Sequence, residues 1–301
     1  MNGQAGIRAV ARRLAVAALA TTLAGMLVAC AGLPPGAGFP RQQSFRLADP
    51  QQTRLGRQMA DAARAHDGQS GFRILTAGVD GLLARVQMID GAERTLDLQY
   101  FIFRGDSSGR LLLDALLRAA DRGVRVRLLV DDGDTHAGDQ QVLALDGRAG
   151  TEVRVFNPFF YRGHANALRA AEFLFNARRL NYRMHNKLLV ADDAIALVGG
   201  RNIGDPYFQL DPDAQLADDD MFVAGPVAGE LSATFDSYWN SGLAIPAAAL
   251  HAARPGPVEH RPVEAGLAAR IAGGEPYAGM LSGHLPLVWA GARVVCDSPD
   301  I

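Results

Sequence analysis

The pattern of apolar and polar positions divides most of the chain into short segments of alternating type. Runs rich in β-branched and aromatic residues predict strands at 72–75, 95–103, 124–132, 152–156 and 221–225. Apolar residues at helical spacing predict helices at 51–66, 79–89, 109–123, around 140–145 and at 227–242. Strands that alternate with helices in this way predict an α/β fold with a largely parallel sheet.

Residues 187–200 break this alternation, because two apolar runs follow one another with only Asp192 and Asp193 between them. This pattern predicts two strands joined by a tight turn. His185 and Lys187 stand two positions apart at the head of the first run, so an extended chain places them on one face. A lysine that enters a packed interior is costly unless it meets an anion. The pair therefore indicates a site for an anionic ligand.

The first thirty residues have the pattern of an export signal. Basic residues precede an uncharged apolar run, which ends in small residues and Cys30. We predict a lipoprotein signal segment over residues 1–30, with Cys30 as the lipidated first residue of the mature chain; an uncleaved membrane anchor is the alternative. Ala31 after the cysteine favours the outer membrane. The expected location is therefore the periplasmic side, tethered to a membrane.

The rest of the chain divides into three parts. Residues 31–50 are rich in Pro, Gly and Gln and predict a linker, and residues 51–242 carry the α/β pattern. Residues 243–301 predict a second linker and, at 292–301, the opening strand of a truncated second half, because an isolated strand is not a stable ending. With 21% charged residues, 49% hydrophobic residues and a net charge of −2, the chain is an ordinary globular protein and does not coat nucleic acid through bulk positive charge.

The polar residues around the two strands have the spacing H-x-K-x4-D-x6-G-G-x-N, formed by His185, Lys187, Asp192, Gly199, Gly200 and Asn202. This spacing resembles the signature of the phospholipase D superfamily. The chain also resembles the type C group of bacterial cardiolipin synthases at 96–100, 109–132, 183–187, 199–205 and 235–241. The resemblance implies a phospholipase D-like α/β sandwich, in which helices flank a mixed, largely parallel sheet.

This resemblance implies covalent catalysis on a phosphodiester in two steps. His185 would attack phosphorus as a neutral imidazole and form a phosphohistidine, while Lys187 holds the phosphoryl oxygens. Asn202 would donate a further hydrogen bond to the same oxygens. Asp192 is counted with His185, Lys187 and Asn202 in the catalytic group. At the far end of the first strand it would orient a partner or hold the turn rather than do the chemistry itself.

Three further residues are predicted to bind the substrate. Gly199 and Gly200 would let the backbone approach the ligand closely, and Arg183 lies two residues before the histidine. The acidic run 218–220 suggests a metal site, but consecutive acids cannot all face one ion, so a solvated loop before a strand is favoured. The family chemistry needs no metal, and the chain has no G-x-G-x-x-G cofactor pattern.

Aromatic and basic residues interleave just before the motif. The aromatic residues are Phe156, Phe159, Phe160, Tyr161, Phe173 and Phe175, and the basic ones are Arg162, Arg169, Arg178, Arg179 and Arg183. They could bind a phospholipid through both acyl chains and phosphate, or single-stranded nucleic acid by stacking. Core aromatics flanked by solvated arginines are the third interpretation. The predicted tether favours phospholipid substrates and a membrane over nucleic acid.

These inferences predict a phosphatidyl transferase of the cardiolipin synthase type, with hydrolysis by a phospholipase D or nuclease as the alternative activity. An inactive, truncated half-enzyme is the alternative outside catalysis. Only His185 has a lysine two residues later, whereas the resembled family carries two such motifs that meet at one site. A second H-x-K-bearing half, or a second copy of the chain, is therefore expected to complete the site. A lone chain should be nearly inactive, because losing a general acid lowers a rate by ~10² to 10⁴, and we expect aggregation or weak association before a productive dimer.

Overall fold

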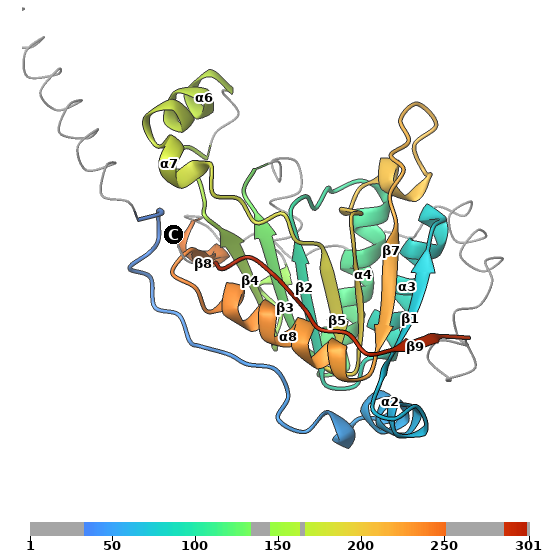
Figure 1. Cartoon of the computed structure of the whole chain (residues 1–301). Helices are drawn as coiled ribbons and strands as arrows, with labels where there is room; N and C mark the ends of the chain where they lie inside the picture. Colours follow the sequence, from blue (N-terminus) through green and yellow to red (C-terminus); the bar gives the residue numbers. More distant parts are fainter. Residues whose placement is uncertain (1–32, 134–144, 163–165, 251–285, 300–301) are drawn as a thin grey trace, which may run out of the picture.

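The computed structural model describes residues 33–133, 145–162, 166–250 and 286–299. Their central feature is one sheet of nine strands in the order β8-β4-β3-β2-β5-β6-β7-β1-β9 (Figure 1). In chain order the strands are β1 (Ser70–Leu75), β2 (Thr95–Tyr100), β3 (Arg125–Asp131), β4 (Thr151–Phe156), β5 (Leu188–Ala191), β6 (Ile195–Gly199), β7 (Asp220–Ala224), β8 (Ala244–Pro246) and β9 (Val288–Ala290). The predicted signal segment with Cys30, and residues 140–144 of a predicted helix, lie outside the described residues.

Strand directions in this sheet are mixed. β2, β3 and β4 pair in parallel, and the other neighbouring strands pair antiparallel. β1 and β6 point the same way as these three, so five of the nine strands share one direction. The predicted α/β class and mixed sheet are confirmed. Direct parallel pairing is limited to β2, β3 and β4, because a parallel pair needs a long crossover connection and α4 (Ser107–Asp121) supplies one between β2 and β3.

Helices cover both faces of the sheet. α3 (Gly78–Gly91) and α4 pack on one face, and α8 (Pro226–Trp239) packs on the other, each over its own apolar core (Figure 1). The smaller helices are η1 (Pro50–Gln52), α2 (Arg54–Ala65), α6 (Asn166–Phe175), α7 (Ala177–Leu180), η2 (Asp205–Phe208) and η3 (Ala247–Ala249). None of the helices in the described part of the chain is long and apolar enough to cross a membrane.

The predicted pair of strands joined by a tight turn is present as β5 and β6. Asp192 and Asp193 lie in the left-handed region, with φ of 52° and 55°, and the N–H of Ala194 donates to the carbonyl of Ala191 at 3.1 Å. A turn with two such residues matches the twist of the flanking strands. Aspartate tolerates this conformation better than most residues, which explains its use at both positions.

Two strands lie outside the segment predicted to form the domain. β8 follows Gly242 and pairs with β4, and β9 pairs with β1. The strand predicted at 292–301 is wrong for the described residues, because positions 291–299 contain no strand. β1 pairs with β7 on one side, and residues 288–290 pair with its other side as β9. This pairing supplies hydrogen-bond partners to backbone groups that would otherwise lie at an open sheet edge.

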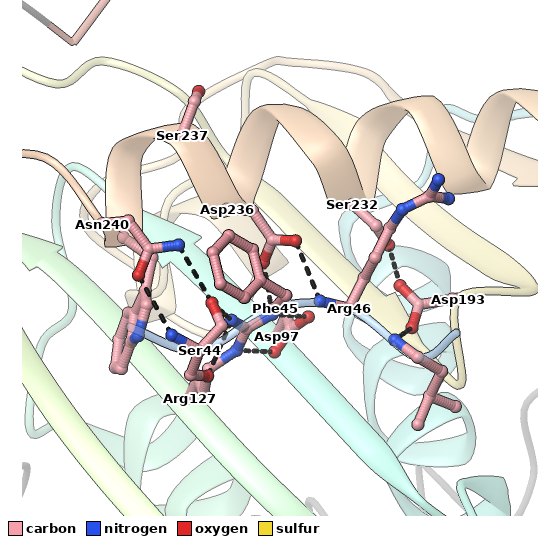
Figure 2. A network of polar contacts seen from close by, with 12 residues as sticks. Ser44, Phe45, Arg46, Asp97, Arg127, Asp193, Ser232, Asp236, Ser237 and Asn240 are labelled. Atoms are coloured by element: carbon pink, nitrogen blue, oxygen red, sulfur yellow. Dashed lines mark hydrogen bonds and ion pairs between the residues drawn. The ribbon is translucent and has the colours of Figure 1, made fainter. Parts of the chain in front are cut away.

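The predicted N-terminal linker is attached to the domain. Residues 42–47, which we call the N-terminal strap, run along α8 (Figure 2). The N–H of Ser44 donates to the Asn240 side chain at 3.1 Å, and that of Arg46 donates to Asp236 at 2.8 Å. Both acceptors are far away in sequence, so composition alone predicts a free linker where the folded chain forms a strap.

Arg127 in β3 connects the strap to the sheet and to α8. Its guanidinium donates twice to Asp97 and once to Asp236, each at 2.7 Å, and once to the Ser44 carbonyl at 2.7 Å. The guanidinium also lies 4.8 Å from the centre of the Phe235 ring. The Arg127 side chain is only 1% exposed, so two carboxylates balance a charge that water does not reach, and a carbonyl accepts a further hydrogen bond from it.

Replacing Arg127 with alanine should strongly destabilise the fold, because Asp97 and Asp236 would lose their shared cation. We expect the free energy of unfolding, measured by urea denaturation, to fall by about 3–5 kcal/mol. The control is Arg118→Ala, which removes ion pairs of a 41% exposed side chain and should cost less than about 1 kcal/mol. Equal losses in the two variants would contradict this role of Arg127.

Candidate active site

The candidate site lies where neighbouring strands end on one edge of the sheet. β2 and β5 run antiparallel with Gln99 opposite Leu188, so the residues after β2 and before β5 lie close together. The rings of Phe101 and His185 are 4.9 Å apart, and the Lys187 Nζ is 5.4 Å from the centre of the Phe101 ring. The structure therefore brings the predicted nucleophile and its lysine together at one aromatic ring.

His185 is exposed, so a ligand can reach its imidazole. Partial burial of the ring and the neighbouring Lys187 ammonium lower the pKa of His185 below its usual value, and the Asp218 carboxylate opposes them. The imidazole is therefore mostly neutral at neutral pH. Neutral imidazole is the form that can act as a nucleophile on phosphorus.

Lys187 is buried, with 4% of its surface exposed. Its Nζ donates to the backbone carbonyl of His185 at 2.6 Å. Burial lowers the pKa of Lys187 to about 8, although the charges of Asp218 and Asp131 raise it. The ammonium is still charged at neutral pH, and a phosphoryl oxygen would be a stronger acceptor than a carbonyl. This is the electrostatic setting expected for an anion-binding lysine.

Asp131, at the end of β3, holds the segment that carries His185. Its carboxylate accepts from the Met184 N–H at 2.9 Å and from Arg183 Nη1 at 3.1 Å. Burial raises the pKa of Asp131 to about 6, and the Arg183 charge opposes this rise. Sequence reasoning missed Asp131, although the carboxyl ends of parallel strands are where α/β folds place their sites. It also missed Phe101, for which the sequence carries no signal.

Arg183 differs from its predicted role in substrate binding. Its Nη1 donates to Asp131 at 3.1 Å, its Nη2 to the Asn157 carbonyl at 2.6 Å, and its Nε to the Tyr182 carbonyl at 3.2 Å. Each guanidinium nitrogen therefore has an acceptor within the protein. In this structure Arg183 holds the backbone that leads to His185 in place, and its guanidinium is bound to protein acceptors rather than directed at a phosphate.

Asn202 is buried beside the same edge of the sheet, at 3% exposure. Its side-chain oxygen accepts from the Ile102 N–H at 3.0 Å, and its Nδ2 donates to the Tyr207 hydroxyl at 2.9 Å. Ile102 follows Phe101 directly, which connects Asn202 to the ring beside His185. A side-chain amide has two N–H groups, so the second can serve a phosphoryl oxygen.

Gly199 and Gly200 are needed because residues 218 and 219 lie too close to their backbone to leave room for a side chain. A Cβ atom on Gly199 would overlap the carbonyl oxygen of Asp219, and one on Gly200 would overlap the Asp218 carboxylate. The acidic run thus packs directly on the glycine turn. This contact places Asp218 where its charge acts on the histidine and lysine of the site.

The prediction that the acidic run 218–220 is a solvated loop is wrong for its last residue. Asp220 is 1% exposed and forms ion pairs with Arg85 at 2.7 Å and Arg201 at 3.2 Å. Asp220 is the first residue of β7, and Arg85 of α3 and Arg201 compensate the burial of its carboxylate. These ion pairs support the turn that carries Asn202.

A cavity of about 400 Å³ opens beside the acidic run, lined by Thr76, Gly78, Arg201, Tyr207, Gln209, Leu216, Ala217, Asp218 and Asp219. Neither His185 nor Lys187 is among these lining residues. The cavity therefore adjoins the site through Asp218 and Tyr207 without containing the catalytic pair.

Asp192 does not lie with the catalytic group, contrary to its predicted place there. Its carboxylate accepts from the backbone N–H groups of Glu93, Arg94 and Thr95, at 2.9, 2.8 and 2.9 Å. The length of β5 separates it from Lys187, a distance of about 16 Å for five residues of strand. Asp192 holds the turn against the start of β2, which was the second of its two predicted roles.

Comparison with known proteins identifies the family of this domain. Residues 86–239 match the family model described as "Cardiolipin synthase, PLD-like domain". The matched segment is more than half of the chain and contains every position of the spaced motif. The fold and the site thus define a phospholipase D-like domain. The chain belongs to the family of cardiolipin synthase, PLD-like domains.

Individual relatives are longer than this chain. Cardiolipin synthase C of Escherichia coli (strain K12) is 38% identical over 244 residues, which are 78% of this chain and 51% of that protein. Major cardiolipin synthase ClsA of Bacillus subtilis (strain 168) is 35% identical over 139 residues, 46% of this chain and 26% of that protein. The chain therefore spans about half or less of the length of these relatives. Among solved structures, NucT from Helicobacter pylori is similar with a TM-score of 0.41 and 16% identity, over 59% of this chain and 99% of that one.

Asp192→Ala should lower stability, because it leaves three backbone N–H groups without their acceptor. We expect the free energy of unfolding to fall by about 2–4 kcal/mol, since hydrogen bonds to charged groups contribute about 1.5–3 kcal/mol each and do not add fully. The control is Asp211→Ala, which removes an exposed carboxylate that accepts from two nearby N–H groups. A variant as stable as the unsubstituted chain would return Asp192 to the catalytic candidates.

Proposed function

We propose that the chain provides the nucleophilic half-site of a phosphatidyl transferase of the cardiolipin synthase type. His185 attacks the phosphorus of a phospholipid, an alcohol leaves, and a phosphohistidine forms. The hydroxyl of a second lipid then attacks the same phosphorus and releases His185. The membership of the chain in the cardiolipin synthase, PLD-like family supports this proposal.

The observation that carries the proposal is the pairing of His185 with Lys187. An exposed imidazole with a lowered pKa stands beside a buried ammonium whose pKa is about 8. Negative charge develops on the phosphoryl oxygens during attack, and a fixed cation in a partly dry site stabilises that charge. Water can replace the second lipid as acceptor, because His185 is exposed, so hydrolysis is the competing activity.

Completion of the site requires a second acid–base group. Among the described residues, the one histidine besides His185 is His66, which stacks on Trp289 in β9 at 4.2 Å. β9 is four strands away from β5, which corresponds to about 19 Å. We therefore propose that a second H-x-K-bearing half, or a second copy of the chain, supplies the proton to the leaving alcohol and accepts it from the attacking one.

We also propose that the protein is exported and tethered to a membrane through a lipid on Cys30, on the periplasmic side. The basic residues, the apolar run and the small residues before Cys30 support this location. A tethered domain would meet its phospholipid substrates without leaving the membrane surface.

Transfer of a labelled phosphatidyl group to the protein tests the proposed chemistry. With a defined labelled phospholipid, the chain should become labelled, and the label should be absent in His185→Ala and strongly reduced in Lys187→Ala. The mass of the protein in solution is recorded on the same sample. A monomer should turn over ~10² to 10⁴ more slowly than a completed site. Label that persists in His185→Ala, or activity that EDTA abolishes and one divalent ion restores, would overturn the mechanism.

The rate should depend on pH in a bell-shaped manner. It should rise as pH passes through the pKa of His185, which lies below 6.5, because only neutral imidazole attacks. It should fall as pH passes about 8, because Lys187 then loses its proton. In Lys187→Arg the alkaline fall should move to higher pH, because a guanidinium stays charged, even if the maximum rate is lower. A rate that stays constant as pH passes about 8 would contradict the proposed role of the charged Lys187 ammonium.

A further inference from the structure

Helix α6 turns polar side chains toward the protein. Arg169 Nη2 donates to the Asp132 carbonyl at 2.6 Å, and its guanidinium lies 4.0 Å from the centre of the Phe159 ring. Glu172 accepts from the Phe160 N–H at 2.7 Å. No residue of α6 is buried. The helix is therefore attached to the domain through polar contacts and not through an apolar core.

The apolar side chains of α6 are left in the open. Leu168, Leu174 and Phe175 are 53%, 77% and 68% exposed, and Phe173 and the nearby Phe160 are 38% and 46% exposed. We call these five residues the α6 apolar surface. In an ordinary surface helix the apolar side chains face the core, whereas the large apolar side chains of α6 remain exposed to solvent. Several exposed large apolar side chains on one short helix are typical of a surface that contacts another apolar phase.

The start of the described chain packs at the same end of the sheet. A Cβ atom on Gly36 would lie 2.7 Å from Ile245 in β8 and 2.9 Å from Ala249, so Gly36 packs against this end of the sheet. Cys30 is six residues earlier, and six extended residues reach at most about 20–22 Å. A lipid on Cys30 would therefore enter the membrane close to β8.

The α6–α7 segment belongs to this corner of the molecule. Phe156 at the end of β4 pairs with Ala244 in β8, and the next residue, Asn157, donates to the carbonyl of Arg179 in α7 at 2.8 Å. Figure 1 shows α6 and α7 projecting beyond the sheet above β8 and β4. The proposed tether and the α6 apolar surface thus lie on one side of the domain.

We infer that the α6 apolar surface docks into the interfacial region of a phospholipid bilayer. Phe175 and its neighbours enter the boundary of the acyl chains, and the exposed Arg178 of α7 meets lipid phosphates. The position of the tether favours a bilayer over a protein partner as the occupant, because it holds this corner at the membrane surface. This inference rests on the proposed function and deepens it, since the bilayer contains the phospholipid substrate.

Docking at α6 would orient the catalytic edge toward the lipid. Arg183 donates to the Asn157 carbonyl, and Asn157 is also bound to α7, so the segment from β4 to His185 is held together. A phospholipid could keep its acyl chains in the bilayer beside α6 while its phosphodiester reaches His185. The surface would then act in substrate delivery as well as in attachment.

Depth-dependent quenching tests the inference on the full chain. Phe175→Trp is reconstituted into vesicles of phosphatidylethanolamine and phosphatidylglycerol, with or without brominated acyl chains, and the signal of the unsubstituted chain is subtracted. We expect bromine to quench the new tryptophan several-fold more strongly than in the control Ile74→Trp, whose site is 61% exposed but lies in β1. Quenching requires contact with acyl chains and does not require catalysis.

Three outcomes decide the question. Strong quenching confined to Phe175→Trp supports docking, and it should persist in a His185→Ala background, which separates it from failure of the proposed chemistry. Equal weak quenching at both positions would overturn the inference. A spectral shift at position 175 that grows with protein concentration, without bromine quenching, would overturn it in favour of a protein partner. Cys30→Ser, measured in parallel, should release the protein from the membrane fraction if the tether is a lipid on that residue.

Discussion

The buried guanidinium of Arg127 is the constraint on which the arrangement of the domain depends. It lies where β2, β3, α8 and the N-terminal strap meet, and it bonds to a group from each of the other three. A buried charge must be matched by partners in fixed positions, because solvent cannot replace them. The strap is therefore part of the domain, and the interior of the protein determines where the chain leaves toward its first residues.

The catalytic edge has a different electrostatic character, because the buried ammonium of Lys187 donates to the neutral carbonyl of His185. Burial shifts the pKa values of Lys187 and Asp131 in opposite directions, to about 8 and about 6. Groups with pKa values shifted in this way concentrate at functional sites. The domain thus combines an arginine held by two carboxylates under α8 with a lysine that donates to a neutral carbonyl at the strand ends.

Local spacing predicted much of this molecule, and long-range contacts account for what it missed. The α/β class, the turn at Asp192 and Asp193, and the pairing of His185 with Lys187 all depend on residues close in sequence. Phe101 and Asp131 come from the ends of β2 and β3, more than fifty residues earlier, so the spacing of residues around His185 did not indicate them. The strap was predicted as a linker for the same reason, because its hydrogen-bond partners lie in α8 and in the sheet.

The anchoring of Asp192 gives the spacing of the H-x-K-x4-D motif a mechanical meaning. The four residues between Lys187 and Asp192 are the four residues of β5. The spacing of the motif therefore equals the length of this strand, with Lys187 at its catalytic end and Asp192 at the end that is held by hydrogen bonds. Side chains along a strand alternate between faces, so an insertion or deletion of one residue would turn Lys187 away from His185 or move Asp192 away from the backbone N–H groups of residues 93–95. In this chain Asp192 can therefore set the geometry of the motif by holding the far end of β5, without contact with a substrate.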